Sequence, residues 1–392
     1  MRDQIDIILK SINNSLKIAE PADISLMTGH AGIALFYYLY GKHKGTETSE
    51  NGLDQSIQEL AESSIVEMHP SFCTGKSGVN WLFTFLYHND VISKTDRDFL
   101  CDDDDDRYEE IALFMLKNSN YDFLHGAIGI AYYLLYSNTY KNPGFFHDIL
   151  NGLNALIDES HDRKMIPYFD GEKGALAINQ VNMGLAHGLP SVLKFCLQCY
   201  NQNICPAQAK SLAILIIDYL KNHTNSDKSL SCYSSIITEN KSDWEYSRLA
   251  WCYGDLGIGY IIYQAGIIFQ DQTNIDFGLG VLKNSTKRRS LEETSANDCG
   301  ICHGSAGIAH IYNKIWQSTR QPIFKEACDF WVKKTLEFLA GSDWLKGYQK
   351  YDGRSKALKY DNALLEGSAG IGLVLLSYLY EDFSWDYLLM LN

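Results

Sequence analysis

The sequence predicts an all-α protein folded as an α/α toroid, a double ring of seven inner and seven outer helices. Three observations support this fold class. A glycine pattern recurs seven times along the 392 residues, a nearly all-apolar segment follows each copy, and strand patterns are scarce. We expect a single domain, residues 1–392, built from seven helical-hairpin repeats, because a period of this size usually holds one supersecondary unit.

The repeated pattern is Gly-x-x-Gly, or a close relative of it, followed by an apolar run. Successive copies begin between 46 and 66 residues apart, and the unequal spacing predicts inserted loops. The first glycines of the seven copies are Gly29, Gly75, Gly126, Gly188, Gly254, Gly304 and Gly367.

The two kinds of helix differ in where their apolar residues lie. Segments directly after the glycines, such as 33–40 and 371–380, are apolar nearly all round, which predicts helices buried on every side. Amphipathic segments lie between them, one beginning at Pro206 and another covering 324–339, and these predict the outer helices. The β-branched piece 231–238 is the place where we expect any strand hairpin.

Charge and composition exclude several classes of protein. The chain has 48 acidic and 34 basic side chains, a formal net charge of −14, which argues against nucleic acid and anionic lipid as partners. It has no apolar run of 18 residues and no apolar signal sequence at its N-terminus, so we expect a cytoplasmic protein with no transmembrane segment and with reduced cysteines. The acidic run 102–106 lacks the spacing of a calcium-binding loop and is interpreted as a solvated loop.

The residues just before each first glycine are the candidates for function. In a toroid the inner helices begin at one end of the central hole, so these residues would line a shared cavity. Three of the seven copies carry Cys there and three carry His, whereas a purely structural ring would favour small or apolar side chains.

Cys252, Cys302 and His303 are the candidate metal ligands. Cys302 and His303 are adjacent, Cys252 occupies the place of Cys302 one repeat earlier, and two thiolates with one imidazole suit Zn²⁺. Three protein ligands leave one tetrahedral position open, as in catalytic zinc sites. Cys299 is an alternative ligand. Cys299 to His303 also spells the C-x-x-C-H signature of haem attachment, which the lack of an export signal disfavours.

The remaining cysteines and histidines are interpreted as structural. Cys196 and Cys199 lie three residues apart in a buried segment, and Cys73 has no histidine beside it, so we expect core thiols. His30 and His310 are expected in the core or at its rim.

The segments WCYGDLGIGY, ICHGSAGIAH, NMGLAHGLP and YDFLHGAIGI resemble those of the lanthionine synthetase C family, the lantibiotic cyclases. The resemblance covers the whole chain, since all seven glycine repeats occur in order. It implies an α/α toroid with one zinc ion per chain held by Cys252, Cys302 and His303. One departure is Leu256, where proline is common in the family, and it should affect only the start of the helix.

The resemblance also implies three catalytic residues, Asp122, His187 and Arg248. The implied reaction is Michael-type addition of a peptide cysteine to dehydroalanine or dehydrobutyrine, which forms a lanthionine or methyllanthionine thioether ring. His187 is expected to protonate the enolate, Asp122 to orient a catalytic group, and Arg248 to stabilise the enolate or hold Asp122. His125 is expected to pack or to contact substrate.

The implied partners are a dehydrated precursor peptide as substrate and a complex with a dehydratase and an exporter. Two alternatives stay open. One is an enzyme that adds a small thiol such as glutathione to dehydrated residues. The other is a non-catalytic peptide-binding scaffold with structural zinc, against which the intact set of Asp122, His187 and Arg248 argues.

Overall fold

The structure is a computed structural model, and the residues that it describes leave out several short segments. The acidic run expected as a solvated loop falls partly outside them, at 102–104. The described ranges are 1–21, 23–63, 68–101, 105–137, 142–159, 168–170, 175–177, 180–225, 229–238, 246–340, 348–352 and 355–392.

All seven buried helices predicted from the glycine repeat are present. Each begins directly after the first glycine of its repeat, and its side chains are buried on nearly all sides, as the apolar pattern predicts. They are α2 (His30–Lys44), α5 (Lys76–His88), α8 (Ala127–Ser137), α10 (Leu189–Asn201), α12 (Asp255–Phe269), α15 (Ser305–Thr319) and α17 (Ser368–Tyr380).

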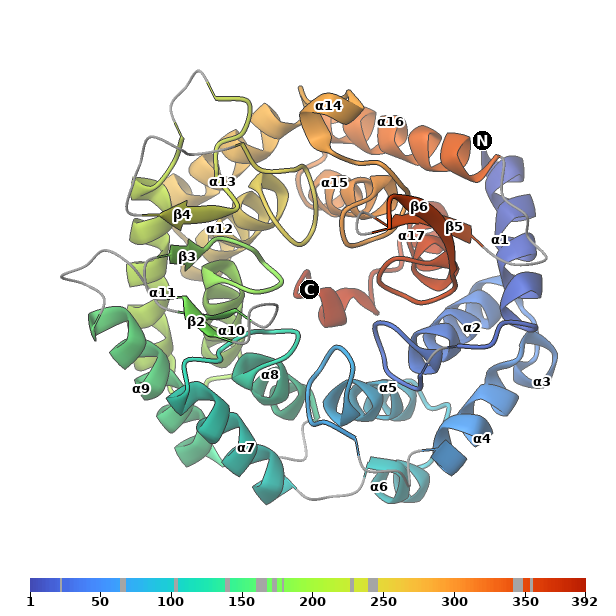
Figure 1. The fold of residues 1–392 in the computed structure, drawn as a ribbon, viewed down its shortest axis with the longest axis horizontal. Helices are drawn as coiled ribbons and strands as arrows, with labels where there is room; N and C mark the ends of the chain where they lie inside the picture. The colour runs from blue at the N-terminus through green and yellow to red at the C-terminus, as the bar shows by residue number, and fades with distance from the viewer. Residues whose placement is uncertain are drawn as a thin grey trace. The chain divides into compact units, whose positions relative to one another are not determined.

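The chain divides into two compact units, and each is described by itself. Within the first unit, α17 packs against both α15 and α2 (Figure 1). Within the second unit, α8 packs against α5 and α10, and α10 packs against α12. Unit 1 comprises Met1–His69, Leu249–Trp251 and Arg289–Asn392, and unit 2 comprises Pro70–Arg248 and Cys252–Arg288. The single domain 1–392 stays a prediction.

Amphipathic helices pack against the buried ones and leave their polar faces exposed. α16 covers α15, α13 covers α12 and α11 covers α10, and the helices predicted to begin at Pro206 and to cover 324–339 are both confirmed. No helix among the described residues has the length and apolarity needed to cross a bilayer. The helices outside the buried set are α1 (Arg2–Leu16), α3 (Thr48–Asn51), α4 (Leu53–Ser63), α6 (Lys94–Cys101), α7 (Asp105–Lys117), α9 (Pro143–Glu159), α11 (Pro206–Asn222), α13 (Gln272–Ser285), α14 (Leu291–Thr294), α16 (Pro322–Leu339) and the 3₁₀ helix η2 (Asp386–Leu389).

Six short strands form three antiparallel pairs among the described residues. The hairpin expected within 231–238 is wrong, because strand 236–238 pairs with 180–182 instead. The physical reason is that Asp255 accepts hydrogen bonds from the backbone N–H groups of Cys232 and Tyr233, which a local hairpin would need. The pairs are β1 (Tyr168–Asp170) with β2 (Ala175–Ala177), β3 (Gln180–Asn182) with β4 (Ile236–Thr238), and β5 (Tyr348–Asp352) with β6 (Ala357–Asp361).

The loop before most buried helices is a tight turn that requires glycine. At five repeats an Asp or Asn stands six residues before the first glycine, and in four of them its side-chain oxygen accepts the backbone N–H two residues later. A Cβ on the glycine would approach that side-chain oxygen to less than 3.0 Å, so a larger residue does not fit. The five residues are Asp23, Asn120, Asn182, Asp298 and Asp361.

Neighbouring loops are joined by backbone hydrogen bonds at the residue two before the first glycine. In unit 1 the Cys302 N–H donates to the Leu365 carbonyl at 3.0 Å, and the Leu365 N–H donates to the Met27 carbonyl at 2.9 Å. In unit 2 the Ala186 N–H donates to the Cys252 carbonyl at 3.3 Å. The residue directly before the first glycine is here called the pre-glycine residue. Because the loops are joined one residue earlier, the pre-glycine residues of two joined loops lie close together.

Replacing Gly188 by Ala should destabilise the protein by about 1–3 kcal/mol, since the new Cβ would clash with the backbone carbonyl of Asn182. Gly280 is the matched control, because it is exposed on α13 and no atom lies within 4 Å of the place that a Cβ would take there. At Gly280, Ala should be neutral or stabilising. Urea unfolding midpoints measure both effects, and equal midpoints for the two variants would contradict the close-packing argument.

Ionisation of Asp255 should lower the free energy of unfolding as pH rises from about 4 to about 6. Burial raises the pKa of Asp255 from 3.8 to about 6, although two backbone N–H groups and Arg288 oppose the shift. Between those values the folded chain holds a proton that the unfolded chain lacks, so unfolding becomes easier as pH rises. The unfolding free energy of wild type minus that of Asp255→Asn should therefore fall from about pH 4 to about pH 6. A constant difference would show that Asp255 ionises with its ordinary pKa.

Candidate metal centre and catalytic groups

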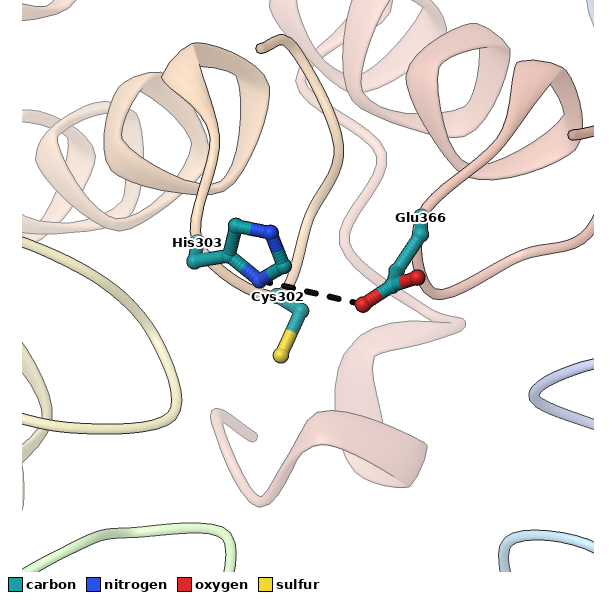
Figure 2. Close-up of side chains that lie close together, drawn as sticks. All are labelled: Cys302, His303 and Glu366. Carbon is teal, nitrogen blue, oxygen red and sulfur yellow. Dashed lines mark ion pairs between the residues drawn. The ribbon is translucent and has the colours of Figure 1, made fainter. Parts of the chain in front are cut away.

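Unit 1 brings together three side chains that can hold a metal ion, Cys302, His303 and Glu366 (Figure 2). One donor atom from each, a sulfur, a nitrogen and an oxygen, lies within 4.8 Å of the other two. All three side chains are half-buried. Their proximity follows from the bond between Cys302 N–H and the Leu365 carbonyl, which joins the loops before α15 and α17.

His303 is oriented by a carboxylate on each side of its ring. Its Nε2 lies 3.4 Å from Oδ2 of Asp298, and its Nδ1 lies 3.8 Å from Oε1 of Glu366. Asp298 is only 3% exposed. A metal-bound imidazole usually donates its second ring N–H to a carboxylate, so Asp298 suits the role of orienting His303 with Nδ1 facing the other donors.

Glu366 is the donor that sequence reasoning missed. It is the pre-glycine residue of the last repeat, the same place that His303 holds in its own repeat, and that shared place was the available signal. Its second oxygen, Oε2, forms an ion pair with Lys350 of β5. Lys350 also pairs with Asp361 at 2.7 Å. Burial by itself would lower the pKa of Lys350, but hydrogen bonds to Asp361 and Glu366 outweigh it and raise that pKa, so the ammonium stays charged.

The donor set fits zinc. Thiolate, imidazole and carboxylate are the ligands that Zn²⁺ takes in proteins, whereas Mg²⁺ and Ca²⁺ prefer oxygen alone. Cys252, the other predicted ligand, is 5% exposed and belongs to unit 2, so its grouping with Cys302 and His303 stays a prediction.

Unit 2 holds a carboxylate–histidine pair formed by two of the predicted catalytic residues. His187 Nδ1 donates to Oδ2 of Asp122 at 2.6 Å, and the backbone N–H of His125 donates to Oδ1 of Asp122 at 2.7 Å. The side chain of Asp122 is 13% exposed and that of His187 is 31% exposed. With Nδ1–H donated to Asp122, Nε2 is the second ring nitrogen of His187 and the one that can exchange a proton.

The charge state of Asp122 follows from these contacts. Burial would raise the pKa of Asp122, but the charge and hydrogen bond of His187, together with His125, outweigh burial and lower it. The carboxylate is therefore ionised at neutral pH and can act as an acceptor for the imidazole N–H.

The other contacts of His187 come from the loops on either side. The His187 ring lies 6.4 Å from that of His125, nearly parallel to it, and 6.1 Å from that of Tyr253. Tyr253, which sequence reasoning did not single out, accepts a hydrogen bond on its hydroxyl from Asn182 at 3.1 Å. Tyr253 directly follows Cys252, whose carbonyl accepts the Ala186 N–H, so His187 and Cys252 sit on joined loops.

Arg248 is the third predicted catalytic residue, and both of its expected roles stay predictions. Its side chain is exposed and makes no ion pair or side-chain hydrogen bond with the described part of the chain. The carboxylate of Asp122 accepts hydrogen bonds from His187 and from the His125 backbone.

The cysteines that were predicted to be structural are buried. Cys73, Cys196 and Cys199 are buried, as predicted for core thiols. Cys299 is also fully buried, and burial raises the pKa of its thiol well above the usual range. The Cys299 thiol is therefore protonated at neutral pH in this environment.

The two histidines expected in the core or at its rim lie there. His310 is buried, and its Nε2 lies 3.1 Å from Asp386 Oδ2. His30 is half-buried at the rim, where it forms a hydrogen bond with Ser56. Both predictions are confirmed.

A solved structure of a known protein has a similar fold. The fold resembles that of a solved nisin cyclase with a TM-score of 0.75, 18% sequence identity, and coverage of 99% of this chain and 96% of that chain. At this identity the likeness concerns the fold alone, and it confirms the predicted fold class, the α/α toroid.

Two curated relatives are similar to this sequence, each at less than 30% identity. Nisin biosynthesis protein NisC of Lactococcus lactis subsp. lactis is 24% identical over 74% of this chain and 73% of the relative. Glutathione S-transferase LANCL1 of Danio rerio is 22% identical over 94% of this chain and 85% of the relative. A family model described as lanthionine synthetase C-like protein matches residues 20–390, and the chain therefore belongs to that family.

Proposed function

We propose that the protein is a zinc-dependent lanthipeptide cyclase. It would join a peptide cysteine to dehydroalanine or dehydrobutyrine of the same peptide, forming lanthionine or methyllanthionine rings. The observation that carries the proposal is the cluster of Cys302, His303 and Glu366, which offers a thiolate, an imidazole and a carboxylate at the start of two buried helices. Membership of the family and the likeness to a nisin cyclase support the choice of reaction.

Cys252, Cys302 and His303 would hold the zinc, one ion per chain. Bound zinc supplies deprotonation of the substrate thiol, whose free pKa near 8.5 leaves only a few per cent as thiolate at neutral pH. The two cysteine thiolates would neutralise the charge of the ion, which keeps an added thiolate electron-rich. Asp298 would hold the His303 ring in the ligating orientation.

His187 would move the proton. Attack of sulfur on the β-carbon leaves an enolate, and the α-carbon must receive a proton to complete the addition. With Nδ1–H fixed on Asp122, His187 can present a proton on Nε2, and the ionised carboxylate stabilises the imidazolium that carries it. This is the orienting role predicted for Asp122.

Arg248 would stabilise the negative charge of the enolate. Its guanidinium is exposed and has no partner in the described structure, so it is available to a substrate carbonyl oxygen. The substrate class that fits is a dehydrated precursor peptide. From the family resemblance we also propose that the protein is cytoplasmic and that it forms a complex with a dehydratase and an exporter.

A second candidate is addition of glutathione to dehydrated residues. It is favoured by the relative named glutathione S-transferase LANCL1, whose match covers 94% of this chain. The two candidates share the thiol-activating site and differ in the thiol donor. Incubating one dehydrated peptide with and without glutathione separates them, since ring closure leaves the peptide mass unchanged and glutathione addition increases it. A non-catalytic scaffold has less support, because Asp122 and His187 form an intact pair.

Zinc content tests the ligand assignment. Wild-type protein should contain one zinc per chain, and Cys302→Ala or Cys252→Ala should lose it, because a methyl group cannot ligate. Elemental analysis of proteins purified without chelator measures this. Cys196→Ala is the matched control, since Cys196 is fully buried in α10 and should not affect the metal. Near-stoichiometric zinc in Cys302→Ala would refute the assignment.

His187→Asn should retain zinc and lose ring formation by about 100-fold or more, the usual contribution of a general acid. Asn preserves a polar side chain toward Asp122 but cannot transfer the proton at neutral pH. Mass spectrometry after thiol alkylation counts the uncyclised cysteines. Full activity with intact zinc would show that another group protonates the enolate.

A further inference from the structure

We propose that Glu366 is a displaceable zinc ligand, which occupies the fourth coordination position until a substrate thiol replaces it, and that Lys350 holds the displaced carboxylate. This inference rests on the proposed zinc site. It changes the resting state of that site from open to closed, and it assigns functions to two residues that the reaction proposed above does not use.

The two oxygens of Glu366 face different partners. Oε1 lies 3.8 Å from His303 Nδ1, within the cluster that includes the Cys302 sulfur (Figure 2). Oε2 faces away from it and pairs with the Lys350 ammonium. A carboxylate placed between a metal-donor cluster and a cation can shift toward either one without a change of backbone.

The backbone keeps Glu366 at this cluster. The N–H groups of Ile301 and Cys302 both donate to the Leu365 carbonyl, at 2.9 and 3.0 Å. Gly300 lies so close that a Cβ there would be 3.0 Å from the Glu366 Cα. The absence of a side chain at Gly300 therefore lets the Glu366 backbone lie directly against the loop that carries Cys302.

Lys350 is held in place by the same two loops. The hydroxyl of Tyr348, two residues before it on β5, accepts the Cys299 N–H at 2.9 Å. The Tyr348 N–H donates to the Ser368 hydroxyl at 3.1 Å. Lys350 also keeps its ion pair with Asp361, so the ammonium has a fixed position whether or not Glu366 is bound to it.

The exchange conserves the charge of the site. With two cysteine thiolates and one neutral histidine, zinc carries no net charge, and either the Glu366 carboxylate or a substrate thiolate adds one negative charge. The thiol proton leaves to bulk water as the sulfur binds. Thiolate is the softer ligand and can replace a carboxylate on zinc, particularly one already shared with an ammonium. Four protein ligands would also keep the resting ion closed, as in structural sites.

Cobalt substitution tests the inference with a readout other than activity. Full-length protein is stripped of metal and loaded with Co²⁺, and its visible spectrum reports coordination number and ligand type. Glu366→Gln should keep one Co²⁺ per chain but change the ligand-field bands of the resting protein. Titration with 2-mercaptoethanol should give a dissociation constant about tenfold lower than in wild type, as expected if the carboxylate blocks the position about nine-tenths of the time.

Two further variants separate ligation from charge. Glu366→Asp keeps the negative charge but shortens the side chain by one methylene, so it should behave like Glu366→Gln. Glu337→Gln is the matched control, because Glu337 is an exposed partner of Lys334 on α16 and should leave both spectrum and thiol affinity unchanged.

Three results would overturn the proposal. One is a Glu366→Gln protein with the wild-type spectrum and thiol affinity. Another is a Glu366→Asp protein that matches wild type while Glu366→Gln differs, which would make the effect one of charge. The third is a wild-type protein without thiolate-to-cobalt absorption, which would refute the zinc site of the proposed function and this inference with it.

Discussion

The backbone hydrogen bonds between neighbouring loops are the constraint on which the site depends. They join each loop to its neighbour, while the shape of each single loop is fixed by a tight turn in which a glycine Cβ would clash with the Asp or Asn six positions earlier. Because the loops are joined at the residue two before the glycine, the following side chains, such as His303 and Glu366, converge without any side-chain attraction being needed. Functional groups can therefore differ from repeat to repeat while the scaffold stays the same.

The same physical device serves both units. In each, a histidine at the pre-glycine position has its ring oriented by a buried or nearly buried carboxylate, Asp122 for His187 and Asp298 for His303. The two histidines differ in the side chains that surround them. His187 lies against the rings of His125 and Tyr253, which suits proton transfer, whereas His303 lies beside a thiol and a second carboxylate, which suits metal binding.

Sequence patterns predicted the buried helices well, because the glycine before each helix and the apolar residues on all its faces are properties of one short segment. They failed at 231–238, where a side chain from the next buried helix, Asp255, takes the backbone donors that a hairpin would use. They left open which group pairs with Asp122, whose carboxylate accepts the N–H of His187 in the structure. Such competition between partners depends on distances that no spacing along the chain reports.

The sequence alone determined the seven repeats, the start of each buried helix and the positions at which chemistry would gather, since all of these follow from residue type and period. It also singled out Cys302 and His303 from their repeat positions, and the family resemblance implied Asp122 and His187. Only the tertiary structure decided which partners these residues have. Glu366 and Lys350 reach the cluster through loop-to-loop bonds and a two-stranded hairpin, contacts that the repeat pattern along the chain does not report.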